Sequence, residues 1–296
     1  MNAFLAMVAV LGVSASGPLM AGTHAPALAI AFWRNAAATV VLAPVAGVRC
    51  RDEYRALDRR HLVLTVLAGV MLAAHFATWV SSLKLTTVAA ATALVTTQLL
   101  WVVAFDAVRG VGVQRSVVVG SLLSVVGVLV VSGVDVSVSW RAAAGDVLAV
   151  AGGAFAAAYL LMGQQVRGVL STTAYTTACY GTCSVVLLVV CVAGGVDLGG
   201  YAARDWLLIA AVTVCAQLLG HSLLNHLLAV MSPLVISLLL LLEVPGAALL
   251  AGVWLGQTPA WGVYVGLGLI LAGLAVVQGT RADSTGQYSL LPGPPV

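Results

Sequence analysis

The sequence predicts an all-α membrane protein with ten transmembrane helices, and composition, run length and an internal repeat are the observations that predict it. Of the 296 residues, 61% are hydrophobic and 8% are charged, whereas a soluble domain carries about 25% charged residues. Because one span needs about 20 apolar residues, ten spans use roughly 200 positions. Unbroken apolar runs such as 117–131 and 234–242 argue against the alternating polarity of a transmembrane β-barrel.

The ten expected spans are apolar runs close to the length that a bilayer requires. The first run lacks the basic start and the small-residue cleavage site of a secretory signal peptide, so we expect it to remain as the first span. In chain order we expect spans at 3–21, 26–48, 62–82, 86–105, 116–134, 145–163, 173–194, 206–228, 232–254 and 261–279.

Basic residues in the loops predict the orientation. Alternate loops hold nine arginines on one side and three basic residues on the other, and the positive-inside rule then places both termini in the cytoplasm of a multi-pass cell-membrane protein. The tail at 281–296 is rich in glycine and proline, and we expect it to be disordered and cytoplasmic. The first side holds Arg49, Arg51, Arg55, Arg59, Arg60, Arg109, Arg115, Arg167 and Arg281, and the second holds Lys84, Arg141 and Arg204.

The basic loop at 49–61 does not indicate a nucleic-acid partner. Five of its residues are arginines, but Asp52, Glu53 and Asp58 lie among them and dilute the positive charge. We therefore expect the partners to be membrane lipid and a small-molecule substrate.

An internal repeat relates the two halves of the chain. An offset of 146 residues carries four glycines of the first half onto glycines of the second without a gap, and it also carries His75 onto His221. We therefore expect one five-helix repeat at 1–138 and another at 139–280. Because an odd number of crossings inserts the second copy upside down, the arrangement is the inverted repeat of secondary transporters. The paired glycines are Gly110 and Gly256, Gly120 and Gly266, Gly127 and Gly273, and Gly133 and Gly279.

Three segments carry a family resemblance that covers nearly the whole chain. They are Phe32-Trp33-Arg34-Asn35 in the second span, residues 242–250 in the ninth, and Leu255-Gly256-Gln257 followed by residues 266–274. With these segments the chain resembles the drug/metabolite transporter superfamily, EamA-type. The resemblance implies ten spans in two five-helix repeats, and a transporter, often an exporter, of amino acids or related small metabolites.

Polar side chains inside the spans are candidate binding residues, because a polar group in hydrocarbon is costly and usually functional. Gln217, His221 and Asn225 recur every four residues on the eighth span and form one polar stripe. The repeat images of this stripe on the third span include His75 and Trp79. Two interpretations stay open: the stripes line a central cavity, or they are hydrogen-bonding seams between helices.

Glu243 lies near the centre of the ninth span. A carboxyl group there either exchanges a proton during transport or is held by a hydrogen bond across helices, with Gln217 or Thr97 as the expected partner. Aromatic residues complete the predicted substrate site. The predicted substrate-binding residues are His75, Trp79, Trp101, Tyr159, Gln217, His221, Asn225 and Glu243.

Arg34 is a further polar residue, about seven positions inside the second span. We expect its long side chain to snorkel to the membrane interface. Binding of a substrate carboxylate and pairing with a polar group of the other repeat are the alternatives. Gly152 and Gly153 in the sixth span, and the segment 14–18 in the first, are candidates for gating.

The function that these observations predict is secondary transport of a small metabolite by alternating access. The family resemblance implies an amino acid or related solute as the substrate and export as the direction. A passive channel or facilitator of the same architecture is the first alternative, and an intramembrane enzyme is the second. The spans carry no HExxH motif, no aspartate pair and no Ser/His/Asp set, and the chain has no P-loop. The histidines lack metal-ligand spacing, so we expect no enzyme activity, metal or cofactor, and a proton is the candidate coupling ion.

Overall fold

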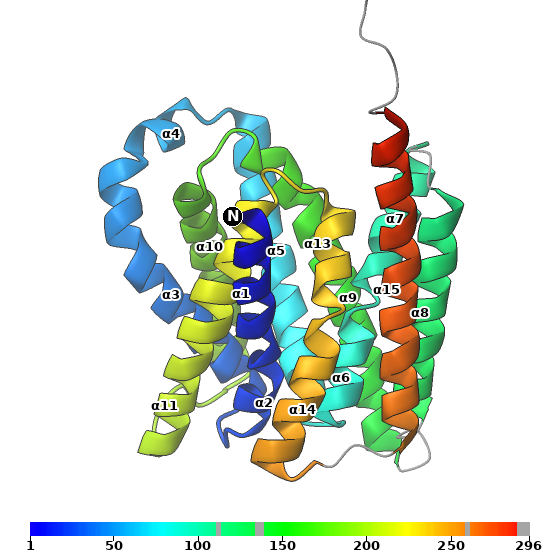
Figure 1. The fold of residues 1–296 in the computed structure, drawn as a ribbon. Helices are drawn as coiled ribbons and strands as arrows, with labels where there is room; N and C mark the ends of the chain where they lie inside the picture. The colour runs from blue at the N-terminus through cyan, green and yellow to red at the C-terminus, as the bar shows by residue number, and fades with distance from the viewer. Residues whose placement is uncertain (111–113, 134–138, 258–260, 289–296) are drawn as a thin grey trace, which may run out of the picture.

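Helices form all the regular structure in the described part of the chain. The computed structural model describes residues 1–110, 114–133, 139–257 and 261–288. The N-terminus, the short helix α4 and the C-terminal end of α15 lie at the same end of the helical bundle (Figure 1). The helices are α1 (Asn2–Ser14), α2 (Ser16–Ala21), α3 (Ala27–Arg49), α4 (Arg51–Ala56), α5 (Arg59–Ser82), α6 (Val88–Val95), α7 (Gln98–Val108), α8 (Arg115–Gly133), α9 (Trp140–Arg167), α10 (Thr172–Ala193), α11 (Ala203–Val212), the π-helix η1 (Thr213–His221), α12 (Ser222–Leu227), α13 (Pro233–Leu240), α14 (Glu243–Leu255) and α15 (Trp261–Tyr288).

Eight helical stretches in the described residues are long and apolar enough to cross a membrane. They correspond to eight of the ten expected spans, and the other two positions hold α8 and α15, whose apolar parts are shorter, at Arg115–Val130 and Trp261–Gly273. The prediction of an all-helical, multi-pass membrane protein is therefore confirmed, while the number of ten spans stays a prediction. The eight stretches are Asn2–Ala21, Ala27–Arg49, Arg59–Ser82, Val88–Val108, Trp140–Arg167, Thr172–Ala193, Ala203–Leu227 and Pro233–Leu255.

Side-chain caps define where several helices begin. The residue before the helix accepts a hydrogen bond from the backbone N–H three positions later, which satisfies one of the free donors of the first turn. Pro233 follows one of these caps at the first helical position, where a missing N–H costs nothing. The capping residues are Asp58, Thr87, Ser139, Ser171 and Ser232.

Two of the spans expected to be continuous are broken by a two-residue turn near their centres, while the first span is divided at Ala15 and the eighth contains the π-helix η1. The fourth span breaks between α6 and α7, and the ninth breaks between α13 and α14. The offset of 146 residues that relates the two halves carries Thr96, in the first break, onto Leu242, in the second. The two interruptions therefore lie at equivalent positions of the sequence repeat.

Each interruption has a local cause. At the first break, the hydroxyl groups of Thr96 and Thr97 donate to the carbonyl oxygens of Ala93 and Leu94, at 2.6 and 2.7 Å, and so compete with backbone bonding. At the second break, Pro245 has no N–H for the carbonyl oxygen of Leu241, and its ring crowds that carbonyl group.

Helices α8 and α15 pack against each other along their length at one side of the bundle (Figure 1). A Cβ atom at Gly127 would lie 2.5 Å from the carbonyl oxygen of Gly266, and one at Gly273 would collide with the backbone of Gly120 and with the Ser124 hydroxyl. The two helix backbones therefore touch at two glycines that the repeat offset pairs, which agrees with a packing role for the small residues of these spans.

The last helix continues beyond the end expected from the sequence. α15 reaches Tyr288, whereas the expected span ended at residue 279 and the expected tail began at residue 281. No proline occurs between Trp261 and Tyr288 to stop the helix. Residues 289–296 of the expected tail lie outside the described residues.

The contact between α8 and α15 predicts opposite effects for two glycine substitutions. Gly127→Ala should lower the free energy of unfolding by about 1–3 kcal/mol, because the added methyl group forces the two backbones apart. Gly268→Ala is the matched control: a Cβ atom there meets nothing within 4 Å, so it should leave stability unchanged or raise it by up to about 1 kcal/mol. Thermal unfolding of the purified proteins in detergent measures both, and equal effects would contradict the assigned contact.

Candidate functional site

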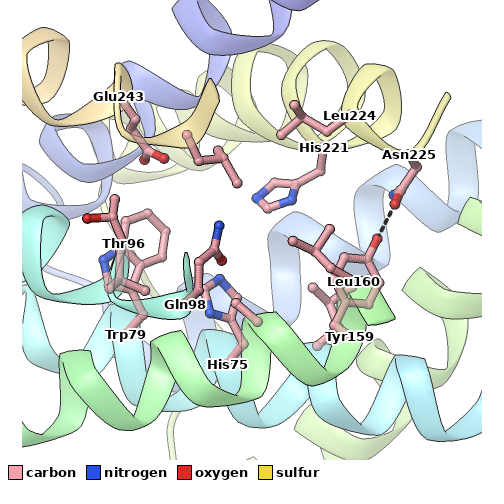
Figure 2. Close-up of a pocket in the computed structure, with 14 residues that line it drawn as sticks. His75, Trp79, Thr96, Gln98, Tyr159, Leu160, His221, Leu224, Asn225 and Glu243 are labelled. Atoms are coloured by element: carbon pink, nitrogen blue, oxygen red, sulfur yellow. Dashed lines mark hydrogen bonds between the residues drawn. The ribbon is translucent and has the colours of Figure 1, made fainter. Parts of the chain in front are cut away.

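A cavity of about 580 Å³, including the part open to solvent, lies between the interrupted spans and their neighbours. Both sequence halves contribute lining residues, and these include polar and apolar side chains (Figure 2). The lining residues are Leu72, His75, Trp79, Val95, Thr96, Gln98, Ala156, Tyr159, Leu160, His221, Leu224, Asn225, Leu240 and Glu243.

The two helix breaks place polar groups at the cavity. Thr96 lies in the first break and Gln98 is the first residue of α7, while Glu243 is the first residue of α14. Backbone N–H groups at the start of a helix have no partner within the helix, and the helix dipole favours negative charge there. A carboxyl group at the start of α14 is therefore in a favourable position.

His75 and His221 enter the cavity from opposite sides (Figure 2). The Nδ1 atom of His75 lies 2.9 Å from the carbonyl oxygen of Gly152, and since a carbonyl oxygen only accepts, Nδ1 donates and Nε2 remains an acceptor. The His75 ring stacks on Trp79 with ring centroids 5.7 Å apart. His221 meets the ring of Phe76 edge-on at 5.4 Å.

Gly152 and Gly153 let α9 approach close enough for the contact with His75. A Cβ atom at Gly152 would lie 3.2 Å from Cβ of Trp79, and one at Gly153 would lie 2.6 Å from the carbonyl oxygen of Val95. These glycines, expected from the sequence to have a gating role, thus allow α9 to contact α5 and the break between α6 and α7.

The opposite end of the cavity from Glu243 is formed by Tyr159 and Asn225 (Figure 2). The Tyr159 hydroxyl donates to Oδ1 of Asn225 at 2.7 Å. The Nδ2 atom of Asn225 and the Nε1 atom of Trp79 are both buried and have no hydrogen-bond partner among the described residues. Two donors at the cavity are therefore unused.

Six of the eight sequence-predicted site residues line this one cavity: His75, Trp79, Tyr159, His221, Asn225 and Glu243. Trp101 and Gln217 do not. Trp101 is 47% exposed, because α7 turns Gln98, Leu99 and Val102 inward and leaves Trp101 on its outer face. Gln217 is fully buried but belongs to a different polar cluster.

That cluster is centred on Arg34, whose side chain is fully buried instead of snorkelling to the interface. Its Nε atom donates to Oε1 of Gln217 at 2.8 Å, and Nη1 donates to the hydroxyl of Ser16 at 3.2 Å. The guanidinium lies 4.3 Å from the centroid of the Phe76 ring. Gln217 also donates from Nε2 to Oδ1 of Asn35 at 3.0 Å. Polar partners inside the bundle therefore hold Arg34, and one of them comes from the other half of the chain.

Gln217 lies in the π-helix η1, which interrupts the eighth span. Its carbonyl oxygen accepts from the backbone N–H of Ser222, five residues later, and from the Ser222 hydroxyl at 3.1 Å. A π-turn is wider than an α-turn and is frequent at functional sites. The expected stripe is divided, with Gln217 facing Arg34 while His221 and Asn225 face the cavity.

Neither partner expected for Glu243 binds it. The Gln217 amide is occupied by Arg34 and Asn35, and the Thr97 hydroxyl donates to Leu94. Two polar lining residues, Thr96 and Gln98, were missing from the sequence-predicted set. Gln98 is an amide within the apolar fourth span, so the criterion applied to Gln217 and Asn225 could have identified it.

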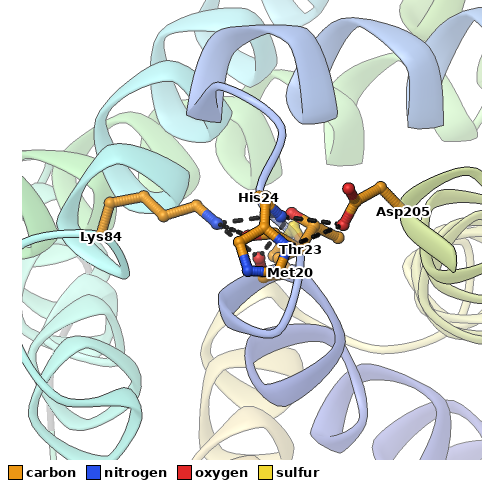
Figure 3. Close-up of polar contacts among 5 residues, drawn as sticks. All are labelled: Met20, Thr23, His24, Lys84 and Asp205. Atoms are coloured by element: carbon orange, nitrogen blue, oxygen red, sulfur yellow. Dashed lines mark hydrogen bonds and ion pairs between the residues drawn. The ribbon is translucent and has the colours of Figure 1, made fainter. Parts of the chain in front are cut away.

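At one end of the bundle, the turn between α2 and α3 is held from two sides (Figure 3). The Lys84 ammonium group, at the end of the third span, donates to the carbonyl oxygens of Met20 and Thr23 at 3.0 and 2.6 Å. Asp205 on α11 accepts from the backbone N–H of His24 at 2.9 Å. Burial lowers the pKa of Lys84 from its ordinary value, while the charge of Asp205 opposes the shift. We call this arrangement the Lys84 clamp.

At the other end of the bundle, Arg167 joins the end of α9 to α12. Its Nε atom donates to the carbonyl oxygen of Asn225 at 2.8 Å, and Nη2 donates to the Thr172 hydroxyl at 2.8 Å. The Glu53 carboxylate on α4 accepts from the backbone N–H of Ser171 at 2.6 Å. This Arg167 network is linked to the cavity through Asn225, which also accepts from Tyr159.

Comparisons with known proteins agree with the fold. Residues 1–133 and 143–278 match the sequence profile of the EamA-like transporter family. A solved structure titled "Crystal structure of protein" is 16% identical and covers 95% of this chain and 98% of its own, with a TM-score of 0.73. At this identity the likeness shows the fold alone. A comparison with curated proteins found no match.

The buried cluster predicts a large stability effect for one glutamine. Gln217→Leu leaves Nε of Arg34 and Oδ1 of Asn35 without partners inside the bundle, and each lost partner costs about 1–3 kcal/mol of unfolding free energy. Gln165→Leu is the control, because Gln165 is exposed and bonds Arg60 at the bundle end, and its effect should stay within about 0.5 kcal/mol. Comparable unfolding temperatures for the two variants would show that the cluster does not stabilise the fold.

Proposed function

Because the chain belongs to the EamA-like transporter family, we propose that it is a secondary transporter that moves a small polar metabolite across the cell membrane by alternating access. The observation that carries the proposal is the cavity at the two interrupted spans, with polar side chains from both halves of the chain. Transporter sites are commonly formed by discontinuous helices at the interface between repeats.

The hydrogen-bonded contacts at the two ends of the bundle, the Lys84 clamp and the Arg167 network, support an alternating mechanism. The Lys84 clamp ties a turn of the first half to α11 of the second, and the Arg167 network ties α9 to α12 and the start of α10 to α4. Each closure consists of a few hydrogen bonds that can break and re-form. Opening one while the other stays closed would expose the cavity to one side at a time, with the halves rocking as an inverted pair.

An amino acid or related solute is the proposed cargo, and export is the proposed direction. The family supports a small-molecule substrate, and the mixed lining suits a solute with polar ends and an apolar body. A proton is the proposed coupling ion, with Glu243 as the group that would exchange it, because a buried carboxyl group near the centre of a span is costly to retain without a function.

Counterflow in proteoliposomes tests the transport proposal. Vesicles loaded with a panel of unlabelled amino acids and amines should accumulate the labelled form of a substrate transiently above its outside concentration. His75→Ala and His221→Ala should each reduce this exchange about tenfold or more, because each removes a polar lining group, while His61→Ala, at the bundle end, should keep it. Exchange that never exceeds equilibration would indicate a passive channel, and unchanged exchange in both variants would remove these residues from the site.

The end of the bundle that carries α4 is proposed to face the cytoplasm. The N-terminus, α4 and the end of α15 lie together there (Figure 1), and this end holds five arginines at 49–60, whereas Lys84 and Arg141 meet at the other end. The positive-inside rule requires this orientation. A phosphatase or fluorescent reporter fused after Gly279 should report a cytoplasmic C-terminus, and a periplasmic-type signal would reverse the assignment.

A further inference from the structure

Polar groups at the two ends of the cavity define the chemistry of a ligand. The Nδ2 atom of Asn225 and the Nε1 atom of Trp79 are buried without a hydrogen-bond partner among the described residues, and Glu243 brings the one carboxyl group of the lining. We propose, on the basis of the transport function above, that the cavity selects a protonated amine whose other end is a neutral hydrogen-bond acceptor. The ammonium group binds at Glu243 and the acceptor binds at Asn225.

The one carboxyl group of the cavity lining lies at the Glu243 end. Glu243 is 6% exposed and is the one carboxyl group among the fourteen lining residues, which include no lysine or arginine. A buried carboxylate without a partner is costly, and an ammonium group removes that cost by pairing with it. The side chains of Thr96 and Trp79 lie beside Glu243 (Figure 2), and the Thr96 hydroxyl donates to Ala93, so its oxygen is available to a second ammonium proton.

The Asn225 end offers donors. Because Oδ1 of Asn225 accepts from Tyr159, the amide is oriented, and its Nδ2 protons are left for a ligand. The proton of the Tyr159 hydroxyl is already donated to Oδ1 of Asn225, so this group does not donate to a ligand. A carbonyl or hydroxyl oxygen at this end would receive the Nδ2 proton that no protein group accepts.

Arg34 does not supply a site for a carboxylate. Its guanidinium is fully buried, lies against the ring of Phe76, and donates to Gln217 and Ser16, while its Nη2 atom has no hydrogen-bond partner among the described residues. It is absent from the cavity lining. Because no lysine or arginine lines the cavity, a ligand with a carboxylate would place its negative charge among neutral donors, whereas an amide or alcohol places an uncharged acceptor there. Of the amino acids and related solutes proposed above, the cavity then favours those without a free carboxylate.

The cavity also accepts an apolar body. Leu72, Val95, Leu160, Leu224 and Leu240 are among its lining residues, and Leu160 and Leu224 lie near Tyr159 and Asn225 (Figure 2). A branched aliphatic chain of leucine size matches this wall, so leucine derivatives isolate the contribution of each ligand group. L-Leucinamide carries both the ammonium group and a neutral acceptor, and it is the probe that the proposal expects to bind best.

The experiment compares four probes with the purified full-length protein. Isothermal titration in detergent measures binding of L-leucinamide, of L-leucine, of 3-methylbutylamine, which lacks the acceptor, and of 4-methylpentanamide, which lacks the amine. L-Leucinamide should bind at least about tenfold more tightly than each of the others, a difference of about 1.4 kcal/mol. The same probes are then used in the counterflow assay.

Two variants assign the ends of the ligand. Glu243→Gln should abolish the advantage of L-leucinamide over 4-methylpentanamide, because the amine no longer meets a carboxylate. Asn225→Leu should weaken L-leucinamide and leave 3-methylbutylamine unchanged, and Asn225→Ser replaces it if the leucine variant does not fold. Asp106→Asn removes a carboxyl group from α7 outside the cavity lining and should leave all four affinities as in the wild type.

The outcomes separate the two proposals. The substrate class is overturned if L-leucine binds as tightly as L-leucinamide, or if 4-methylpentanamide does. The proposal that the protein transports other solutes stands in either case. Absence of binding by all four probes also overturns the substrate class, since the cavity then takes no amine of this kind. Only the further absence of counterflow with the whole panel would count against the transport function itself.

Discussion

The buried guanidinium of Arg34 is the constraint around which the interior is organised. A permanent positive charge lies within the bundle, with no carboxylate within hydrogen-bonding distance among the described residues, and neutral acceptors and an aromatic face hold it. Its partners come from α2, η1 and α5, so the charge can be accommodated only when these helices are in their observed places. Phe76, which covers the guanidinium, also contacts His221. The position of a cavity residue thus depends on the packing of a charge outside the cavity.

The two interrupted helices lie at equivalent positions of the sequence repeat, and each brings polar side chains to the cavity. In each half the break removes regular hydrogen bonds near the centre of the span and places the first turn of a new helix at the cavity. The two halves reach this geometry by different means, threonine hydroxyl groups in one and a proline in the other. The chemistry of the halves differs accordingly: the first supplies Thr96 and Gln98, and the second supplies Glu243. The two breaks are therefore equivalent in the position of the backbone, whereas their side chains differ.

The fold class and the positions of the apolar helices were predictable from the sequence, and six of the eight residues predicted for the substrate site line one cavity. The length of an apolar run indicates a membrane span directly. A polar residue within such a run is costly in hydrocarbon, so it usually has a functional or structural role. The partner of a polar residue is not encoded locally, which is why Gln217 was placed with His221 when its amide in fact binds Arg34. The π-turn of η1 and the outward direction of Trp101 depend on neighbouring helices in the same way. The break before Pro245 did have a local signal in the proline itself.

The α8 and α15 pair has a bearing on how motion in this protein can be observed. Neither helix contributes a residue to the cavity, and their backbones meet at glycines. The close approach of the backbones, with Ile270 packed against Gly127, leaves little space for one helix to slide on the other. The pair therefore offers an internal reference frame: spectroscopic labels on it should keep a constant separation, and distances from it to α5 or α12 would record the rearrangement of the cavity walls.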